Sequence, residues 1–402
     1  MKITARNINQ IKESFKKLVD KYQQLSDEYD PDDSVYEISI GMEEIQLPFP
    51  KDPDAFHQVS DFIRLMNEFE SIRFESKNKV ITTRFSQRAI FCNDQLFYEI
   101  VENGKNNLEF TFNDITLRIV NNPILIGLGS LHYGLWDKYV PPCSSYNAIE
   151  VEYKGDRSNV NEDELITSYI YSLAVKFDFD IHLIDVYDSG LFDFDTDEEV
   201  DPKNHKIDSI ESYNFGMDLY LKANRDIDEE MRLLYYYKVL EFFAPVEIKK
   251  NANEKLRLKL FSPKATEPDA NFLQSIFALT KRYEEDLRDN ELIKPLLREC
   301  IDIVDLYEFL PESIKHKIRR ELKISIVSYD LDSQNVIKLS DYISTIIYAT
   351  RNSFVHAKSN YSSNGKECTD EELADLNIFL KHTCNSVIKW YNRLPNHLKI
   401  MN

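Results

Sequence analysis

Glycine is scarce in this chain, at 9 of 402 residues. Folds that hold a phosphate in a glycine-rich loop need several glycines close together, and neither G-x-x-x-x-G-K-[ST] nor G-x-G-x-x-G occurs here. The sequence therefore argues against a fold built around such a loop.

Cysteine pairs and long apolar runs are also missing. The five cysteines are odd in number and none forms a C-x-x-C pair, which is typical of a reducing compartment. No apolar stretch approaches the length that spans a membrane, and the first residues lead into a polar helical pattern rather than a signal peptide. We therefore expect a cytoplasmic protein with no membrane partner.

Charge is present in excess but is unevenly spread. The formal net charge is −20, and residues 1–225 hold 41 of the 69 acidic and 23 of the 49 basic residues. The remaining residues are almost neutral, with 28 acidic and 26 basic side chains. An acidic half repels phosphate backbones, so we expect any nucleic-acid surface to lie in the second half.

The first 225 residues predict a mixed domain. Apolar residues at helical spacing predict helices over 9–25, 54–74 and 162–176. Alternating or β-branched runs predict strands over 80–85, 95–101, 108–112, 115–120, 148–153 and 180–186, which suggest an antiparallel meander. We expect an acidic domain over 1–225 with a sensing or regulatory role, and an α+β fold class for the whole chain.

From Asp226 onward the pattern is helical. The predicted helices are 226–243, ended or kinked by Pro245, then 270–289, 290–309, a short one after Pro311, 333–358 and 369–394. We expect these residues, 226–402, to form an all-α bundle.

One polar hexapeptide stands near the end of the predicted helix 333–358, namely Arg351-Asn352-Ser353-Phe354-Val355-His356. A guanidinium can stabilise a phosphate that gains charge, and an imidazole can move a proton near neutral pH. Asn352 and His356 lie one helical turn apart. One helix does not aim Arg351 and His356 at a single phosphate, whereas two such helices meeting at a symmetric interface could.

The spacing Arg351-Asn352-x3-His356, on the penultimate helix of a helical C-terminal domain, resembles the R-x(4-6)-H signature of the HEPN superfamily. The upstream segment 235–243, Tyr-Tyr-Tyr-Lys-Val-Leu-Glu-Phe-Phe, is similar to the opening helix of HEPN domains of the anti-phage abortive-infection type. The resemblance covers about 226–402 and leaves the first half unrecognised.

The resemblance implies a homodimeric endoribonuclease that needs no metal or other cofactor and acts in anti-phage defence or as a growth-arresting toxin. It implies that His356 is a general acid or base, that Arg351 holds the phosphate, and that Asn352 orients one of them. Lys358 stands where some HEPN toxins carry a modified tyrosine, and it could add a phosphate contact. Glu241 is a candidate to orient Arg351 from the neighbouring helix. RNA is the expected substrate, and a phage trigger or an antitoxin protein is a possible partner.

The run 315–320, Lys-His-Lys-Ile-Arg-Arg, offers Lys315, Lys317, Arg319 and Arg320 as contacts to an RNA backbone. A solvated helix face explains the same run equally well, because Glu312 and Glu321 dilute its charge.

Two alternatives to the nuclease assignment stay open. In the first, Arg351 forms an ion pair with Glu241 or another acid and His356 caps the helix end, within a non-catalytic binding or regulatory module. In the second, Asp137 with Glu152 and Lys154 on a predicted strand form a metal-dependent DNA nuclease site in the first half.

Overall fold

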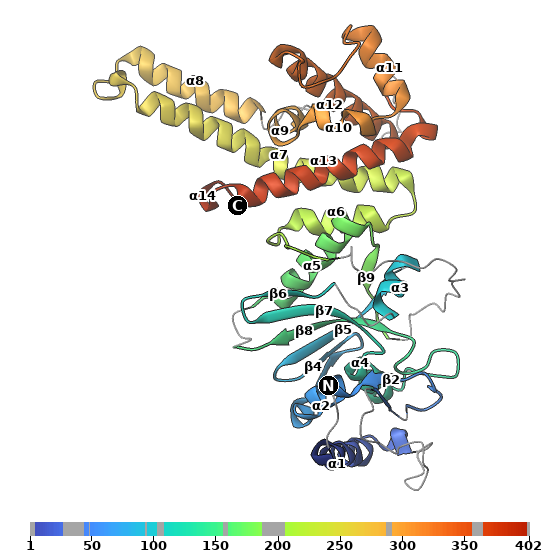
Figure 1. Ribbon diagram of the computed structural model, residues 1–402. Helices are drawn as coiled ribbons and strands as arrows, with labels where there is room; N and C mark the ends of the chain where they lie inside the picture. Colours follow the sequence, from blue (N-terminus) through green and yellow to red (C-terminus); the bar gives the residue numbers. More distant parts are fainter. Residues whose placement is uncertain are drawn as a thin grey trace. The chain divides into compact units, whose positions relative to one another are not determined.

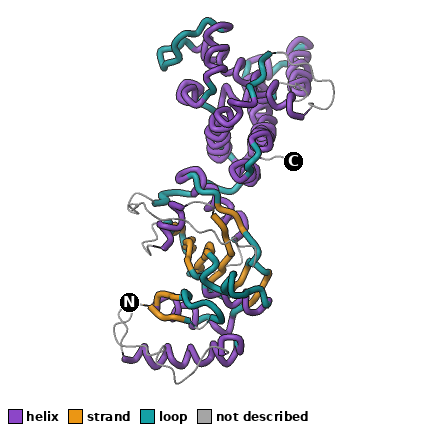
Figure 2. Tube along the Cα trace, turned by 90° about the vertical axis from the view of Figure 1, so that its right-hand side faces the viewer, coloured by secondary structure: helices purple, strands orange, loops and turns teal. Residues whose placement is uncertain are grey.

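The computed structural model describes residues 5–26, 44–47, 49–92, 95–102, 108–155, 160–186, 206–286, 292–355 and 365–399. The chain divides into two compact units, Met1–Ile210 and Glu211–Asn402. The division precedes the expected one after residue 225, because helix α6 (Phe215–Arg225) packs against α7 (Glu229–Leu260) and α13 (Leu373–Arg393) of the second unit. Strands occur in the described part of the first unit, and the described part of the second is helical (Figure 2). The predicted α+β class is confirmed.

An antiparallel sheet forms the centre of the first unit (Figure 1). Its strand order is β3-β4-β5-β8-β7-β6, and β9 pairs with β5. The strands are β3 (Arg73–Ser76), β4 (Lys79–Ile81), β5 (Phe85–Cys92), β6 (Phe110–Phe112), β7 (Ile115–Asn121), β8 (Asn147–Tyr153) and β9 (Ile181–Leu183). Because β8 lies between β5 and β7, both of its edges are hydrogen-bonded, and its residues are almost all buried.

Helices cover both faces of this sheet. The helices are α1 (Ala5–Lys21), α2 (Val59–Met66), α3 (Gln95–Glu102), α4 (Ile124–Tyr133) and α5 (Glu162–Phe177). On one face, α1, α2 and α4 share a core with the sheet and with the small hairpin β1 (Glu44–Gln46) and β2 (Phe56–Gln58). On the other face, Glu162 of α5 accepts hydrogen bonds from Ser86 and Tyr153 of the sheet.

Three predictions for the first unit are wrong. The segment predicted as strand 95–101 is helix α3, because Phe97, Ile100 and Val101 are buried at the i, i+3, i+4 spacing of one helical face. The helix predicted over 54–74 is only the eight residues of α2, since the segment begins in β2 and ends in β3. The strand predicted over 80–85 is interrupted by a turn. In this turn the Thr82 hydroxyl accepts from the amide of Phe85, the Thr82 amide donates to the carbonyl of Phe85, and β5 begins at Phe85.

The second unit consists of helices in its described residues. They are α6, α7 (Glu229–Leu260), α8 (Ala270–Asp286), α9 (Ile293–Cys300), α10 (Ile303–Leu306), α11 (Glu312–Glu321), α12 (Ser333–Val355), α13 (Leu373–Arg393) and α14 (Asn396–Lys399). The carboxylate of Asp228 caps α7 by accepting from the amides of Glu230 and Met231. Of the two expectations for Pro245, that it ends the helix or kinks it, the first is wrong, because α7 continues to Leu260. Phe243, Ala244 and Val246 are buried around the proline, and this packing offsets the lost backbone hydrogen bond.

None of the described helices is both long enough and apolar enough to cross a bilayer.

Candidate functional site

Helix α12 positions Arg351 and Asn352 at its C-terminal end. Leu339, Ile343 and Ile347, spaced four residues apart, are fully or almost fully buried and fix the helix in the core. Arg351 lies four residues beyond Ile347 and faces α7, which packs against α12. Its side chain is 25% exposed, so its guanidinium is partly open to solvent.

Three groups surround the Arg351 guanidinium. Its Nη1 donates a hydrogen bond of 2.9 Å to Oδ1 of Asn352. Its Nη2 lies 3.7 Å from Oε1 of Glu241 on α7, and that carboxylate is 41% exposed. Its central carbon lies 5.2 Å from the ring centre of Tyr237, one turn earlier on α7. Burial raises the pKa of Tyr237, so the phenol stays neutral and its ring acts as a platform for the cation.

Glu241 therefore contacts Arg351, as predicted. At 3.7 Å, with both side chains partly in solvent, this ion pair is long and weak. Asn352 also lies where it can orient the guanidinium. His356 and Lys358 lie outside the described residues, so their placement beside Arg351 stays a prediction.

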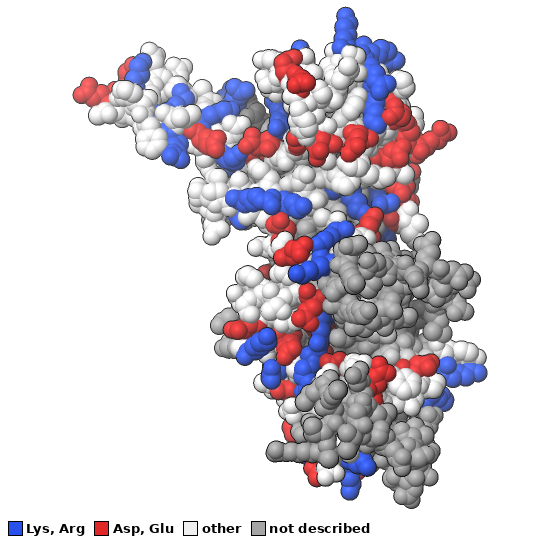
Figure 3. Space-filling view, in the orientation of Figure 1, with Lys and Arg blue, Asp and Glu red and all other residues white. Residues whose placement is uncertain are grey.

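The basic run lies on α11, where Figure 3 shows Lys and Arg side chains with acidic side chains close by. Lys315 is paired with Glu312 and also binds the carbonyl of Glu308. Lys317 donates to the carbonyl of Glu367.

The two arginines of this run are more open. Arg320 is 75% exposed, although Glu321 contacts it at 3.0 Å. Arg319 is exposed beside Tyr307. Both arginines could meet a phosphate, whereas the two lysines of the run are engaged by the protein itself.

The residues of the alternative metal site lie in the first unit, and each has another role. Asp137 accepts hydrogen bonds from the amides of Tyr139 and Val140 in a turn. Glu152 forms ion pairs with Arg64 and Arg84, and Lys154 is exposed. Among the residues that the structure describes, no group of three or more His, Cys, Asp or Glu side chains is arranged to hold a metal ion.

Sequence reasoning missed a charged network in the middle of the first sheet. Glu150 on β8 lies directly opposite Gln87 on β5 and Arg118 on β7. Arg118 binds the carboxylate at 2.7 Å and Gln87 donates to it at 2.7 Å. Arg64 of α2 adds a third contact at 2.8 Å. The charged residues Arg118 and Glu150 in otherwise apolar strands were the available signal of a buried network. Their partners could not be identified, because these residues lie far apart in the sequence.

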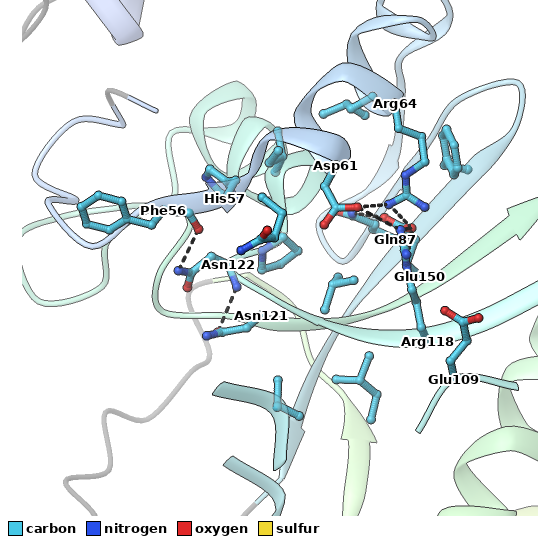
Figure 4. A pocket seen from close by; sticks show the side chains of 18 of the residues that line it. Phe56, His57, Asp61, Arg64, Gln87, Glu109, Arg118, Asn121, Asn122 and Glu150 are labelled. Carbon is cyan, nitrogen blue, oxygen red and sulfur yellow. Dashed lines mark hydrogen bonds and ion pairs between the residues drawn. The ribbon is translucent and has the colours of Figure 1, made fainter. Parts of the chain in front are cut away.

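This network forms one end of a cavity of about 530 Å³ (Figure 4). Asp61 of α2 contacts both Arg64 and Arg118 there, at 3.0 and 3.3 Å. Phe56 and the amide side chain of Asn122 lie toward the other end.

Burial dominates the proton equilibria of this cavity. It raises the pKa of Glu150 to about 7, outweighing Arg64 and the Gln87 hydrogen bond, and Asp61 and Glu152 act in the same direction. Burial also raises the pKa of Asp61. It lowers the pKa of His57 to about 3, so this histidine is neutral at physiological pH.

No family model, no curated protein sequence and no solved structure matches this chain.

Proposed function

We propose that the protein is a metal-independent endoribonuclease of the HEPN type, with its active site at the C-terminal end of α12. In the proposed reaction the ribose 2′-oxygen attacks the adjacent phosphorus and the bond from phosphorus to the 5′-oxygen breaks. His356 takes the 2′-hydroxyl proton or supplies a proton to the leaving 5′-oxygen. The products are a 2′,3′-cyclic phosphate and a 5′-hydroxyl end.

One observation supports this proposal above the others, namely the state of the Arg351 guanidinium. It is partly exposed, hydrogen-bonded to Asn352 and placed on the Tyr237 ring, and its acidic neighbour is 3.7 Å away. A weak exposed ion pair contributes little to stability and is readily exchanged for a phosphate, whose two oxygens match the guanidinium fork. Glu241 would keep the side chain oriented until RNA arrives.

The active form in this proposal is a homodimer in the cytoplasm. Two copies of α12 would bring two Arg351 and two His356 side chains around one scissile phosphate. Arg319 and Arg320, with Lys358, would contact the RNA on either side. The biological role would be anti-phage defence or toxin-type growth arrest, with a phage trigger or an antitoxin protein acting on the chain.

Of the alternatives, a non-catalytic helical module is the stronger rival, because the contact between Arg351 and Glu241 has a purely structural explanation. A metal-dependent DNA nuclease in the first unit is less well supported, since Glu152 already binds two arginines.

Sequencing of RNA ends tests the proposal. Cells that express the wild-type chain should accumulate new 5′-hydroxyl ends, and cells that express His356→Ala should not. His132→Ala is a matched control, because this exposed histidine lies in the first unit and stacks on Phe74. Equal accumulation of ends in wild-type and His356→Ala cells would refute the assignment.

A further inference from the structure

The cavity of the first unit holds more negative than positive groups. Its described lining includes four carboxylates, Glu44, Asp61, Glu109 and Glu150, and two guanidiniums, Arg64 and Arg118. Glu152, just outside the lining, also pairs with Arg64. The cavity therefore has an unfavourable excess of negative charge, which an incoming positive charge would relieve.

The two arginines of this cavity are not available to an anion. Arg64 contacts Asp61, Glu150 and Glu152 within 3.1 Å. Arg118 contacts Glu150 at 2.7 Å and Asp61 at 3.3 Å. A phosphate or carboxylate ligand would have to displace one of these carboxylates and then face the rest of them. The arrangement disfavours nucleotides and other anions.

Asp61 has room for a further partner. Its Oδ1 accepts from both Arg64 and Arg118. Within the described part of the chain, its second oxygen accepts no hydrogen bond, and the side chain is 41% exposed toward the cavity (Figure 4). Burial raises the pKa values of Asp61 and Glu150, and a cation bound beside them would favour their charged forms.

The rest of the lining suits an aliphatic or planar cation. Leu65, Phe85 and Val120 contribute apolar surface, against which methylene groups can pack. The ring of Phe56 is 49% exposed and offers a face to a cationic group. Glu44 and Glu109 are exposed carboxylates that can hold ammonium groups. The volume falls in the range of small-molecule sites.

We propose that this cavity binds a small organic cation carrying amino or guanidino groups on an aliphatic chain. Asp61 and Glu109 would hold one charged end, Phe56 and Glu44 would hold another, and the apolar residues would contact the stem between them. The cationic group belongs either to a free amine or to an arginine or lysine side chain of a peptide, since both present the same chemistry. This site is separate from the proposed nuclease site and does not depend on it.

Calorimetric titration of the full-length protein at 150 mM NaCl tests this proposal. The probes are spermidine, agmatine and acetyl-Gly-Arg-Gly-amide, with ATP as the anionic comparison. We expect one cation bound per chain and no binding of ATP. Tighter binding of the free amines would identify a metabolite as the source of the cation, and tighter binding of the tripeptide would identify a peptide side chain.

Three variants locate the binding. Glu44→Gln with Glu109→Gln removes two exposed carboxylates without touching the core, and should weaken binding by about fivefold or more. Asp61→Asn should weaken it as well. Glu70→Gln is the control, because Glu70 is exposed and does not line the cavity. The proposal is overturned if no cation binds, if ATP binds instead, or if all variants lose affinity equally, which would indicate general attraction to an acidic protein.

Discussion

The arginines of the cavity in the first unit and Arg351 of the second unit have opposite surroundings. In the first unit Arg64 and Arg118 are held by short contacts to two or three carboxylates each. In the second unit Arg351 has one distant carboxylate, an amide and an aromatic ring. The comparison teaches that the number and distance of its partners, rather than the residue type, decide whether an arginine can meet a phosphate. Arg64 and Arg118 are structural by this criterion, and Arg351 is available.

The chain offers a direct way to study the units separately. Its two tryptophans are Trp136 in the first unit and Trp390 in the second. In a Trp390→Phe background, fluorescence follows unfolding of the first unit alone, and in a Trp136→Phe background it follows the second. The unfolding of each unit can then be analysed as a separate transition with its own free energy. A single free energy of unfolding is not well defined for a protein with two units.

The largest effect on stability is expected at the buried network. Glu150→Ala leaves two guanidiniums with fewer partners in the centre of a sheet, and should lower the free energy of unfolding of the first unit by about 3 kcal/mol. Urea titration followed by Trp136 fluorescence measures this change. A loss below about 0.5 kcal/mol, the size seen at exposed pairs, would remove the contrast between the two units.

The stability of the first unit should also depend on pH through the buried Glu150. Burial raises the pKa of Glu150 from 4.5 to about 7 on folding, so the folded form binds the proton more tightly. The stability that this group contributes is complete below about pH 4.5 and is lost as the pH rises to about 7. The urea concentration at the midpoint of unfolding of the wild-type first unit should fall as the pH rises from 5 to 8. It should fall less for Glu150→Gln, where Asp61 supplies the remaining slope. If the midpoints of the wild type and of Glu150→Gln changed with pH in parallel, the raised pKa of Glu150 would be contradicted.

The smallest effect is expected at Glu241. Because this carboxylate is exposed and 3.7 Å from Arg351, Glu241→Gln should change the free energy of unfolding of the second unit by less than about 1 kcal/mol. Trp390 fluorescence measures it. A loss as large as that of Glu150→Ala would mean that Arg351 is a structural residue, as in the non-catalytic alternative.

Local features of the sequence predicted their structures well. Helix α12, the strands β6, β7 and β8, and the adjacency of Arg351 and Asn352 follow from neighbours in the chain. The Glu241 contact was inferred from the packing of neighbouring helices, and α7 does pack against α12.

Three other features that depend on tertiary packing were not predictable from the sequence alone. The network around Glu150 joins α2 to three strands, and the side chains of Arg64 and Glu150 are 86 positions apart. The run of Leu, Phe, Tyr, Ile and Val in α3 suits a strand as well as a helix, and only burial against the sheet selects the helix. The continuation of α7 through Pro245 likewise depends on packing.

The most direct test of the central claim is the cleavage rate of a labelled RNA by Arg351→Ala, measured with excess EDTA. Arg393→Ala is the control, because Arg393 is 68% exposed and has a similarly weak ion pair, 3.6 Å from Glu211. The claim predicts that Arg351→Ala cleaves at least about 100-fold more slowly while the second unit keeps its stability and Arg393→Ala keeps its activity. Cleavage by Arg351→Ala at the wild-type rate would contradict it.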